Sequence, residues 1–312
     1  MIGKDADRPL PRRKTPDEQA GDMQRWNQRW MEVERLRRVV EEAMPGRSRF
    51  TQEIHLFMFI IEAHLGSDWV TANAEFHADG KPGKGAEYLR RDSELGIPEL
   101  SQHYLRLREL ARRLFAFEDE NFYGRLRANL LRRDLEGAAF EADVVQSLLA
   151  LPVLIDLRGE RNVKGDDYDI DVWLRPPHKK WSIEAKTKHD GGPYTRGGLL
   201  NTIRGARRQL PANGIGSIFM KVPQAWASNP AFQAEAEEAI ESFLRNTSRV
   251  HAVVIVWDIY SYDSINEKSW SWKPGRMVYR SPNIDPLVDE LLGFYQRLWS
   301  QPRDYAELIF PF

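Results

Sequence analysis

Polar and apolar residues alternate along two short segments between Gly165 and Lys188. From Tyr168 to Leu174 (YDIDVWL) every second residue is apolar or aromatic, and the same period recurs from Trp181 onward (WSIEAKTK). A period of two is typical of β-strands, in which successive side chains point to opposite faces. Because only the short run RPPHKK connects the two segments, they are predicted to form an antiparallel hairpin.

The same alternation places the charged side chains of each segment on one side of its strand. Asp169 and Asp171 share a side of the first strand, and Glu184 and Lys186 share a side of the second. Pairing the strands brings these carboxylates together, and clustered carboxylates repel unless a positive charge lies between them. Oxygen ligands of this kind suit a hard divalent cation. The pattern therefore predicts a divalent metal site on the hairpin.

Segments with helical or strand periodicity flank the hairpin in a regular order. The stretch 137–151 places its apolar residues on one helical stripe, and the stretch 199–210 reads as a helix that ends at Pro211. Short apolar runs between turn residues predict strands. In chain order the expected elements are helix 137–151, strand 153–158, the hairpin, helix 199–210, strand 217–222, helix 231–244 and strand 250–258.

These residues and this order resemble the PD-(D/E)xK superfamily of nucleases, which have the restriction-endonuclease-like fold. The matching positions are Asp171 in DIDVWL and Glu184-Ala185-Lys186 in SIEAKTK, although the proline of the family name is absent before Asp171. The resemblance covers residues 133–258. It implies an α/β fold with a restriction-endonuclease-like core, in which helices flank a mixed sheet. The spacing of apolar residues before residue 133 predicts an α-helical N-terminal region ahead of this core.

The resemblance also implies a reaction, a metal and site residues. A Mg²⁺ or Mn²⁺ ion held by Asp171 and Glu184 would polarise a phosphoryl oxygen and lower the pKa of its bound water. Lys186 would orient that water, and Glu141, on the helix before the first strand, would add a ligand or hold a metal-bound water. Asp169 competes for the ligand role, but Asp171 is preferred because Val-Trp-Leu after it continues the strand as in the family pattern. The expected activity is that of a Mg²⁺-dependent endonuclease.

Two other interpretations stay open. A Glu-x-Lys segment by itself is typical of an exposed edge strand, whose lysines discourage aggregation. A chain with this fold can also bind nucleic acid or protein without cleaving anything. The presence of Asp171, Glu184 and Lys186 together favours the enzyme. Asp166 and Asp167 follow a glycine and are interpreted as turn residues.

The rest of the chain is expected to be helical at its N-terminal side. Residues 1–20 are charged and rich in proline, which predicts a disordered tail. Residues 21–132 are predicted to form an α-helical region, and residues 133–312 a nuclease-like domain with a C-terminal helix. Helical spacing of apolar residues predicts helices at 22–44, 52–65, 97–117 and 121–135, and a closing helix within 281–300.

Composition favours a cytoplasmic location and excludes some kinds of site. The 312 residues are 42% hydrophobic and 29% charged, and contain no cysteine, which excludes disulfides and cysteine-based zinc sites. The N-terminus is polar and shows no secretory signal. The most apolar run, residues 54–65, is too short to span a membrane and contains Glu62.

Local charge indicates a nucleic-acid partner, although the net charge of −1 gives no overall attraction. From Arg158 to Arg208, twelve Lys or Arg residues accompany seven Asp or Glu residues. Arg204, Arg207 and Arg208 lie three and four apart on one predicted helix and, with Lys188, are predicted to contact phosphates. Each of these residues alone is equally compatible with a solvated surface. DNA is the expected substrate, and cutting both strands with one site per chain would favour a homodimer.

Overall fold

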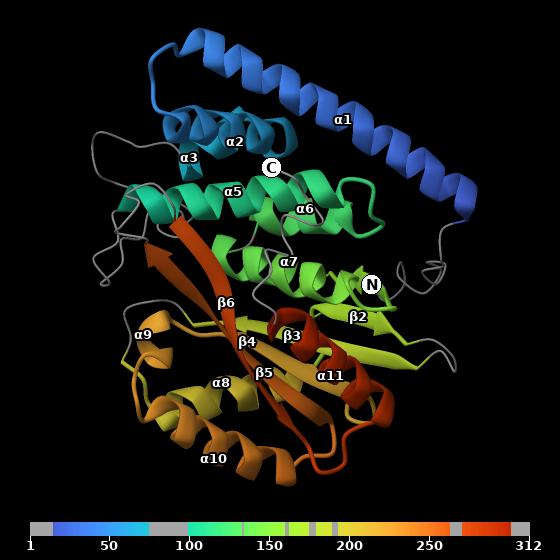
Figure 1. Cartoon of the computed structure of the whole chain (residues 1–312). Coiled ribbons are helices and arrows are strands. Elements are labelled where there is room, and N and C mark those ends of the chain that lie inside the picture. The colour runs from blue at the N-terminus through green and yellow to red at the C-terminus, as the bar shows by residue number, and fades with distance from the viewer. Residues whose placement is uncertain are drawn as a thin grey trace.

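One mixed sheet lies at the centre of the molecule (Figure 1). The computed structural model describes residues 15–74, 99–132, 134–159, 162–174, 179–188, 193–262 and 270–300. Within these residues the sheet has six strands, which lie side by side in chain order: β1 (Leu154–Leu157), β2 (Ile170–Trp173), β3 (Lys180–Thr187), β4 (Ile215–Lys221), β5 (Val250–Tyr262) and β6 (Trp270–Arg280).

The strands combine antiparallel and parallel pairing. β1, β2 and β3 form an antiparallel meander, β3, β4 and β5 are parallel, and β6 is antiparallel to β5. Parallel neighbours need crossover connections. The first crossover is α8 (Arg196–Gln209), and the second contains α9 (Gln224–Ala227) and α10 (Phe232–Arg245). The predicted α/β class, a mixed sheet flanked by helices, is confirmed.

The two faces of the sheet pack against different helices. On one face, which we call the α8 face, Ile218 of β4 belongs to the same buried cluster as Ile203 of α8. On the other, the α7 face, Ile183 of β3 belongs to the same buried cluster as Val145 of α7 (Leu135–Leu149). Because side chains alternate along a strand, each strand is divided between these two faces.

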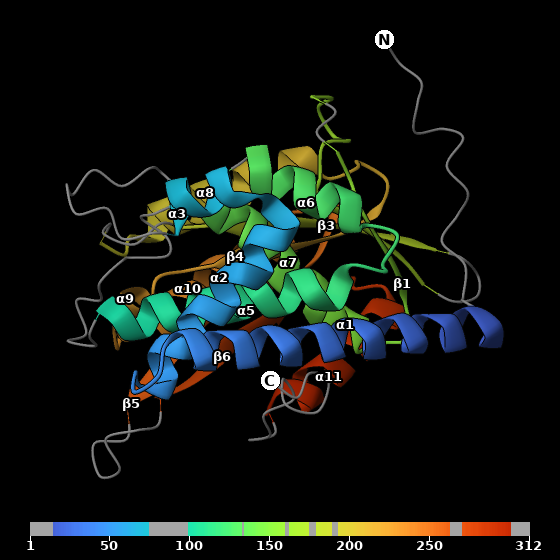
Figure 2. The ribbon, with the colours of Figure 1, turned by 90° about the horizontal axis from the view of Figure 1, so that it is seen from above.

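Further helices cover the α7 face in layers (Figure 1). They are α1 (Pro16–Ala43), α2 (Arg49–Leu65), α3 (Ser67–Asn73), α5 (Glu99–Phe117), α6 (Tyr123–Arg132) and α11 (Pro286–Ser300). Seen from above, the N-terminal part of α1 extends beyond the other helices (Figure 2). One continuous buried cluster includes Val33 of α1, Ile61 of α2, Leu114 of α5 and Ile183 of β3. The helical region and the sheet therefore share one core. Within the described ranges, no helix combines the length and the apolar character needed to cross a membrane.

The first helix begins earlier than its apolar spacing predicts. The Thr15 hydroxyl accepts a hydrogen bond from the Glu18 N–H (3.3 Å), and the Glu18 carboxylate accepts one from the Thr15 N–H (2.7 Å). This reciprocal capping box, with Pro16 as the first helical residue, starts α1. The predicted tail at 1–20 is therefore wrong for residues 16–20, and residues 1–14 lie outside the described part of the chain.

The structure contains elements that the sequence did not predict, among them α3, α9 and the edge strand β6. β6 contains Pro274-Gly275, a pair that favours a turn. An edge strand tolerates proline because only one side of it needs backbone donors. Gly275 is required there because a Cβ at this position would collide with the ring of Trp257 on β5.

A buried ion-pair network joins the helical region to the sheet. The Lys221 Nζ at the end of β4 lies 2.8 Å from an Asp258 carboxylate oxygen and 3.8 Å from one of Asp143 on α7. Arg113 of α5 also pairs with Asp143. Burial raises the pKa of Asp143, and the charges of Arg113 and Lys221 oppose that effect. Loss of one cation would therefore leave a carboxylate in a poorly solvated place.

Lys221→Met is expected to lower the free energy of unfolding by about 3–5 kcal/mol, because it removes the ammonium that lies 2.8 Å from the buried Asp258 carboxylate. Arg196→Met is the control, because it removes an ion pair at the surface. The Arg196 side chain is 45% exposed and that of its partner Glu238 is 68% exposed. That substitution is expected to change the free energy by less than about 1 kcal/mol. Urea unfolding measures both. Equal effects in the two variants would contradict a structural role for the Lys221 network.

Candidate active site

The β2–β3 hairpin brings Asp169 and Glu184 together. In the register Ile170 lies opposite Ile183, and Asp169, one residue before β2, is close enough to Glu184 for its negative charge to raise the pKa of Glu184. An Asp169 carboxylate oxygen accepts a hydrogen bond from the Ala185 N–H at 2.8 Å, which holds the side chain against β3. Glu184 in turn forms an ion pair with Lys186. Three of the predicted site residues, Asp169, Glu184 and Lys186, are thus gathered in one place.

A β-bulge at the start of β2 sets the direction of Asp169. Ile170 opposes Ile183, and the Asp169 N–H also donates to the Ile183 carbonyl at 3.1 Å. Two residues of one strand therefore oppose one residue of the other, which is how a bulge re-aims a side chain. On its other side, the Asp169 carbonyl accepts a hydrogen bond from the Arg158 N–H (2.8 Å) after β1. The bulge is therefore held from both neighbouring strands.

Glu184 is a carboxyl group in an environment that opposes its ionisation. It is 0% exposed and lies beside Ile218 in the β3–β4 register, on the α8 face. Burial first, and the negative charge of Asp169 second, raise the pKa of Glu184 to about 9, against the opposing effect of Lys186. No N–H or O–H group of the described residues donates a hydrogen bond to the Glu184 Oε2. A cation between the two carboxylates would lower the cost of ionising both.

Asp171, the aspartate preferred from sequence, has other partners. One of its oxygens accepts a hydrogen bond from the Tyr168 hydroxyl at 2.7 Å and lies 3.6 Å from the Lys180 Nζ. The other lies 3.9 Å from the Arg158 Nε. Its side chain is 16% exposed. The geometry therefore favours Asp169 over Asp171 as the partner of Glu184, the reverse of the order of preference drawn from sequence.

Glu141 lies on α7 and is held by the helical region. It is 2% exposed, and its Oε2 accepts a hydrogen bond from the Asn129 Nδ2 of α6 at 2.9 Å. α7 packs on the face occupied by Ile183, whereas Glu184 lies on the α8 face. A role for Glu141 in a metal site stays a prediction.

The donor set suits some metal ions better than others. Among the residues that the structure describes, no group of three or more His, Cys, Asp or Glu side chains is arranged to hold a metal ion. Mg²⁺ keeps several waters and takes only one or two carboxylates from a protein. Asp169 and Glu184 supply two carboxylates, and they fit Mg²⁺ or Mn²⁺.

The predicted nucleic-acid contacts divide between exposed and packed side chains. Arg204 and Arg208 of α8 are exposed, whereas Arg207 is half-buried. The Arg207 guanidinium lies 6.0 Å from the centre of the Phe243 ring on α10, so it packs one helix on the other. Lys188 is half-buried, and its N–H donates to the Lys221 carbonyl. Of the four predicted contacts, Arg204 and Arg208 are therefore the exposed ones.

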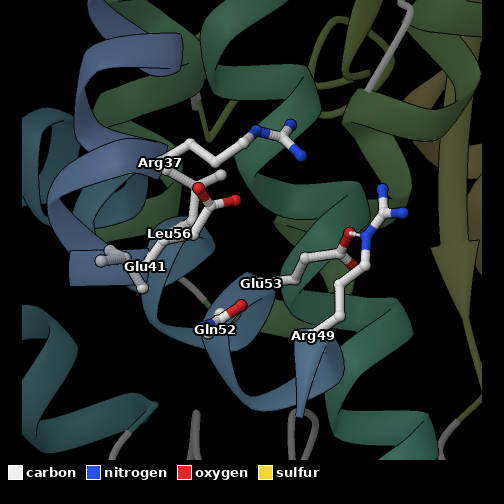
Figure 3. Close-up of a pocket in the computed structure, with 7 residues that line it drawn as sticks. Arg37, Glu41, Arg49, Gln52, Glu53 and Leu56 are labelled. Carbon is white, nitrogen blue, oxygen red and sulfur yellow. Dashed lines mark hydrogen bonds and ion pairs between the residues drawn. The ribbon is translucent and has the colours of Figure 1, made fainter. Parts of the chain in front are cut away.

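A small cleft lies elsewhere, between α1 and α2 (Figure 3). Its volume is about 20 Å³, which is enough for about one water molecule. The Arg49 guanidinium at its edge is paired with Glu53 at 3.0 Å. The cleft is too small to hold a nucleotide, and the carboxylate pair on the hairpin stays the better candidate. The residues around the cleft are Arg37, Val40, Glu41, Arg49, Gln52, Glu53 and Leu56.

Sequence reasoning missed two residues beside the site, Tyr168 and Arg158. The Arg158 guanidinium lies 3.9 Å from the centre of the Tyr168 ring, and Tyr168 is 2% exposed. The only signal in the sequence was position, because Tyr168 directly precedes Asp169 and Arg158 directly follows β1.

Comparison with known proteins adds no family to this geometry. No protein-family model, no curated protein and no solved structure matches the chain. Any assignment of function therefore depends on the site and the fold themselves.

Proposed function

We propose that this protein is a metal-dependent nuclease with a restriction-endonuclease-like core, which hydrolyses phosphodiester bonds in DNA. The observation that carries the proposal is the buried pair Asp169 and Glu184 on the β2–β3 hairpin, with Lys186 beside it. Burying two carboxylates side by side is costly, and such arrangements with shifted pKa values are concentrated at functional sites.

The chain order of the elements supports the proposal. The helix α7 is followed by the antiparallel meander β1–β2–β3, by the crossover helix α8 and by β4, which is parallel to β3. α7 and α8 lie on opposite faces of the sheet. This is the order expected from the resemblance to PD-(D/E)xK nucleases, with the acidic residues at the start of β2 and on β3.

The side chains of the site suggest distinct roles in hydrolysis. Asp169 and Glu184 would hold Mg²⁺ or Mn²⁺, which when bound supplies Lewis-acid polarisation of the phosphoryl oxygen and a water of lowered pKa. Lys186 is 30% exposed, so its ammonium can reach both Glu184 and a bound phosphate. There it would offset the negative charge that develops on the phosphoryl oxygens. The Ala185 N–H would keep Asp169 oriented throughout.

One observation favours an alternative. Glu184 is completely buried, which limits access of a substrate to its carboxylate. A non-catalytic module that binds nucleic acid or protein on this fold would not need that access. Metal binding separates the two candidates, since a binding module has no need for Mg²⁺ or Mn²⁺ at the Asp169–Glu184 pair.

A cleavage assay with defined metals tests the proposal. Supercoiled plasmid, linear duplex, single-stranded DNA and RNA are incubated with the protein in Mg²⁺, in Mn²⁺ or in EDTA, and calorimetry measures Mn²⁺ binding in parallel. We expect products with DNA in either metal and none in EDTA. Metal binding without any product would refute cleavage of these substrates while leaving the metal site in place. The absence of both metal binding and product would refute the nuclease and support the binding module.

Two exposed arginines are expected to contribute to DNA affinity. Replacing both Arg204 and Arg208 by alanine should weaken duplex binding and reduce the slope of log affinity against log salt by about 0.9 for each lost phosphate contact. The loss should be similar for every DNA sequence, because phosphate contacts carry no base information. Arg207→Ala is the matched control from the same helix, and its side chain packs on Phe243. An unchanged slope in the double variant would move the DNA-binding surface away from α8.

A further inference from the structure

Tyr168, the residue directly before Asp169, is fixed from several sides. Its ring faces the Arg158 guanidinium, whose carbon lies 3.9 Å from the ring centre, and the Lys180 Nζ lies 5.5 Å from the same centre. Its hydroxyl donates a hydrogen bond to Asp171 at 2.7 Å. With 2% of its surface exposed, Tyr168 is a buried aromatic residue whose polar end has a defined partner. It has little freedom to move.

Asp171 completes this arrangement and has its charge balanced within the protein. Lys180 and Arg158 approach its two oxygens, at 3.6 Å and 3.9 Å. Asp171 also lies directly opposite Asp156 in the β1–β2 register, a pairing of like charges that the two cations offset. A carboxylate with these partners does not need a metal ion to compensate it. The Asp169–Glu184 pair, by contrast, has Lys186 as its neighbouring cation.

The loop that leads to Tyr168 is anchored as well. Arg158 donates a hydrogen bond to the Asp166 carboxylate at 2.8 Å. The Asp167 N–H donates a hydrogen bond to the carbonyl of Gln209, at the end of α8, at 3.2 Å. The Asp167 carbonyl accepts one from the Gln209 side-chain amide, also at 3.2 Å. The Arg158 N–H meanwhile holds the Asp169 carbonyl. The chain is therefore restrained on both sides of Tyr168, and the bulge at Asp169 follows directly.

We propose that Tyr168 and Asp171 are positioning residues, which hold the bulge so that the Asp169 carboxylate stays beside Glu184. The inference rests on the proposed function, in which Asp169 is a metal ligand. Tyr168 can restrain Asp169 directly because the two residues are adjacent in the chain. Fixing the Tyr168 ring restricts the backbone from which the Asp169 side chain projects. Asp171 acts through the Tyr168 hydroxyl and does not touch the metal.

Substitutions at the two positions separate a positioning role from a ligand role. Tyr168→Phe keeps the ring and removes only the hydroxyl. Asp171→Ala removes the acceptor, whereas Asp171→Asn retains an oxygen that can accept from Tyr168. A positioning role predicts that Tyr168→Phe and Asp171→Ala each weaken Mn²⁺ binding by about tenfold. The double variant should bind Mn²⁺ no more weakly than either single variant. Asp171→Asn should bind Mn²⁺ almost as tightly as the wild type. Tyr279→Phe and Asp289→Asn are controls of the same chemistry on β6 and α11.

A second measurement does not depend on metal or activity. The Ala185 N–H donates to the Asp169 carboxylate, so its hydrogen exchange in EDTA reports whether Asp169 is in place. We expect exchange at Ala185 to be about tenfold faster in Tyr168→Phe and Asp171→Ala, with the other β3 amides unchanged. Failure of Glu184→Gln to affect Mn²⁺ binding would refute the proposed metal site, and the exchange result would still decide the positioning role. An unchanged Ala185 rate, or Asp171→Asn as damaging to Mn²⁺ binding as Glu184→Gln, would overturn the inference.

Discussion

Replacing Glu184 with glutamine is expected to abolish metal-dependent cleavage and Mn²⁺ binding together. Glutamine has nearly the same shape but no charge, so the pair that we propose to hold the metal loses one of its two carboxylates. A bound metal contributes several kcal/mol to transition-state stabilisation, which corresponds to a loss of about 10³-fold or more in kcat. The control is Glu238→Gln, which makes the same chemical change on α10 at a side chain that is 68% exposed. Normal cleavage by Glu184→Gln would show that the Glu184 carboxylate is not required for the reaction.

The same substitution should stabilise the metal-free protein. The pKa of Glu184 is about 9 in the folded chain, against an ordinary value of 4.5. A raised folded-state pKa means that stability is fully present below pH 4.5 and is lost as the pH rises toward 9, because the unfolded chain gives up the proton more easily. In EDTA at pH 8, Glu184→Gln is therefore expected to have a free energy of unfolding higher than that of the wild type by at least ~2 kcal/mol.

Urea unfolding at a series of pH values measures this difference. The gap between Glu184→Gln and the wild type should widen from pH 5 to pH 8 in EDTA. It should narrow when Mn²⁺ is added if, as we propose, the metal binds the folded wild type. A gap that does not depend on pH would mean that the Glu184 carboxyl is not held in the environment described above.

Residues 133–312 expressed alone are expected not to fold cooperatively, although the sequence resemblance lies within them. The buried cluster runs from Val33 and Ile61 through Leu114 to Val145 and Ile183, so removal of the N-terminal helices exposes the outer side of α7. Exposing a buried Leu, Ile or Phe side chain costs about 1.5–3 kcal/mol, and five such side chains approach the whole stability of a typical domain.

The truncated chain should therefore aggregate or behave as a molten globule, with dye binding to exposed apolar surface and no sharp thermal transition. Circular dichroism and thermal unfolding measure this. Co-expression with residues 15–132 is the control and should restore one cooperative transition. A cooperative transition in residues 133–312 alone would show that the helical layer is dispensable for folding.

Local patterns in the sequence were sufficient for the elements around the site. Alternation along WSIEAKTK predicted β3 and placed Glu184 and Lys186 on one side of it, and the short connection predicted the antiparallel pairing with β2. Helical stripes predicted α2, α5, α7, α8 and α10 to within a few residues. These features follow from periods of two and 3.6 residues, which are properties of the chain itself.

The choice between Asp169 and Asp171 was decided only by the tertiary structure. Simple alternation gives the two aspartates the same side of the strand, and nothing in the sequence marks a bulge between Asp169 and Ile170. The bulge depends on hydrogen bonds to both sides of β2. The Asp169 N–H donates to the Ile183 carbonyl of β3, and the Asp169 carbonyl accepts from the Arg158 N–H, which follows β1. A single extra residue in a strand changes the direction of the side chains that follow, so the local pattern cannot determine it.

The same limit applies to the wider organisation of the molecule. The spacing of Arg204, Arg207 and Arg208 placed them on one helix, but contact with Phe243, 36 residues further along the chain, decided that Arg207 packs while the other two stay exposed. Apolar stripes on the N-terminal helices predicted that those helices bury one side, without indicating which surface they bury it against. Periodicity determines which residues of an element turn inward. The partner surface depends on contacts between residues distant in sequence, and these exist only once the sheet and the helical layer have packed together.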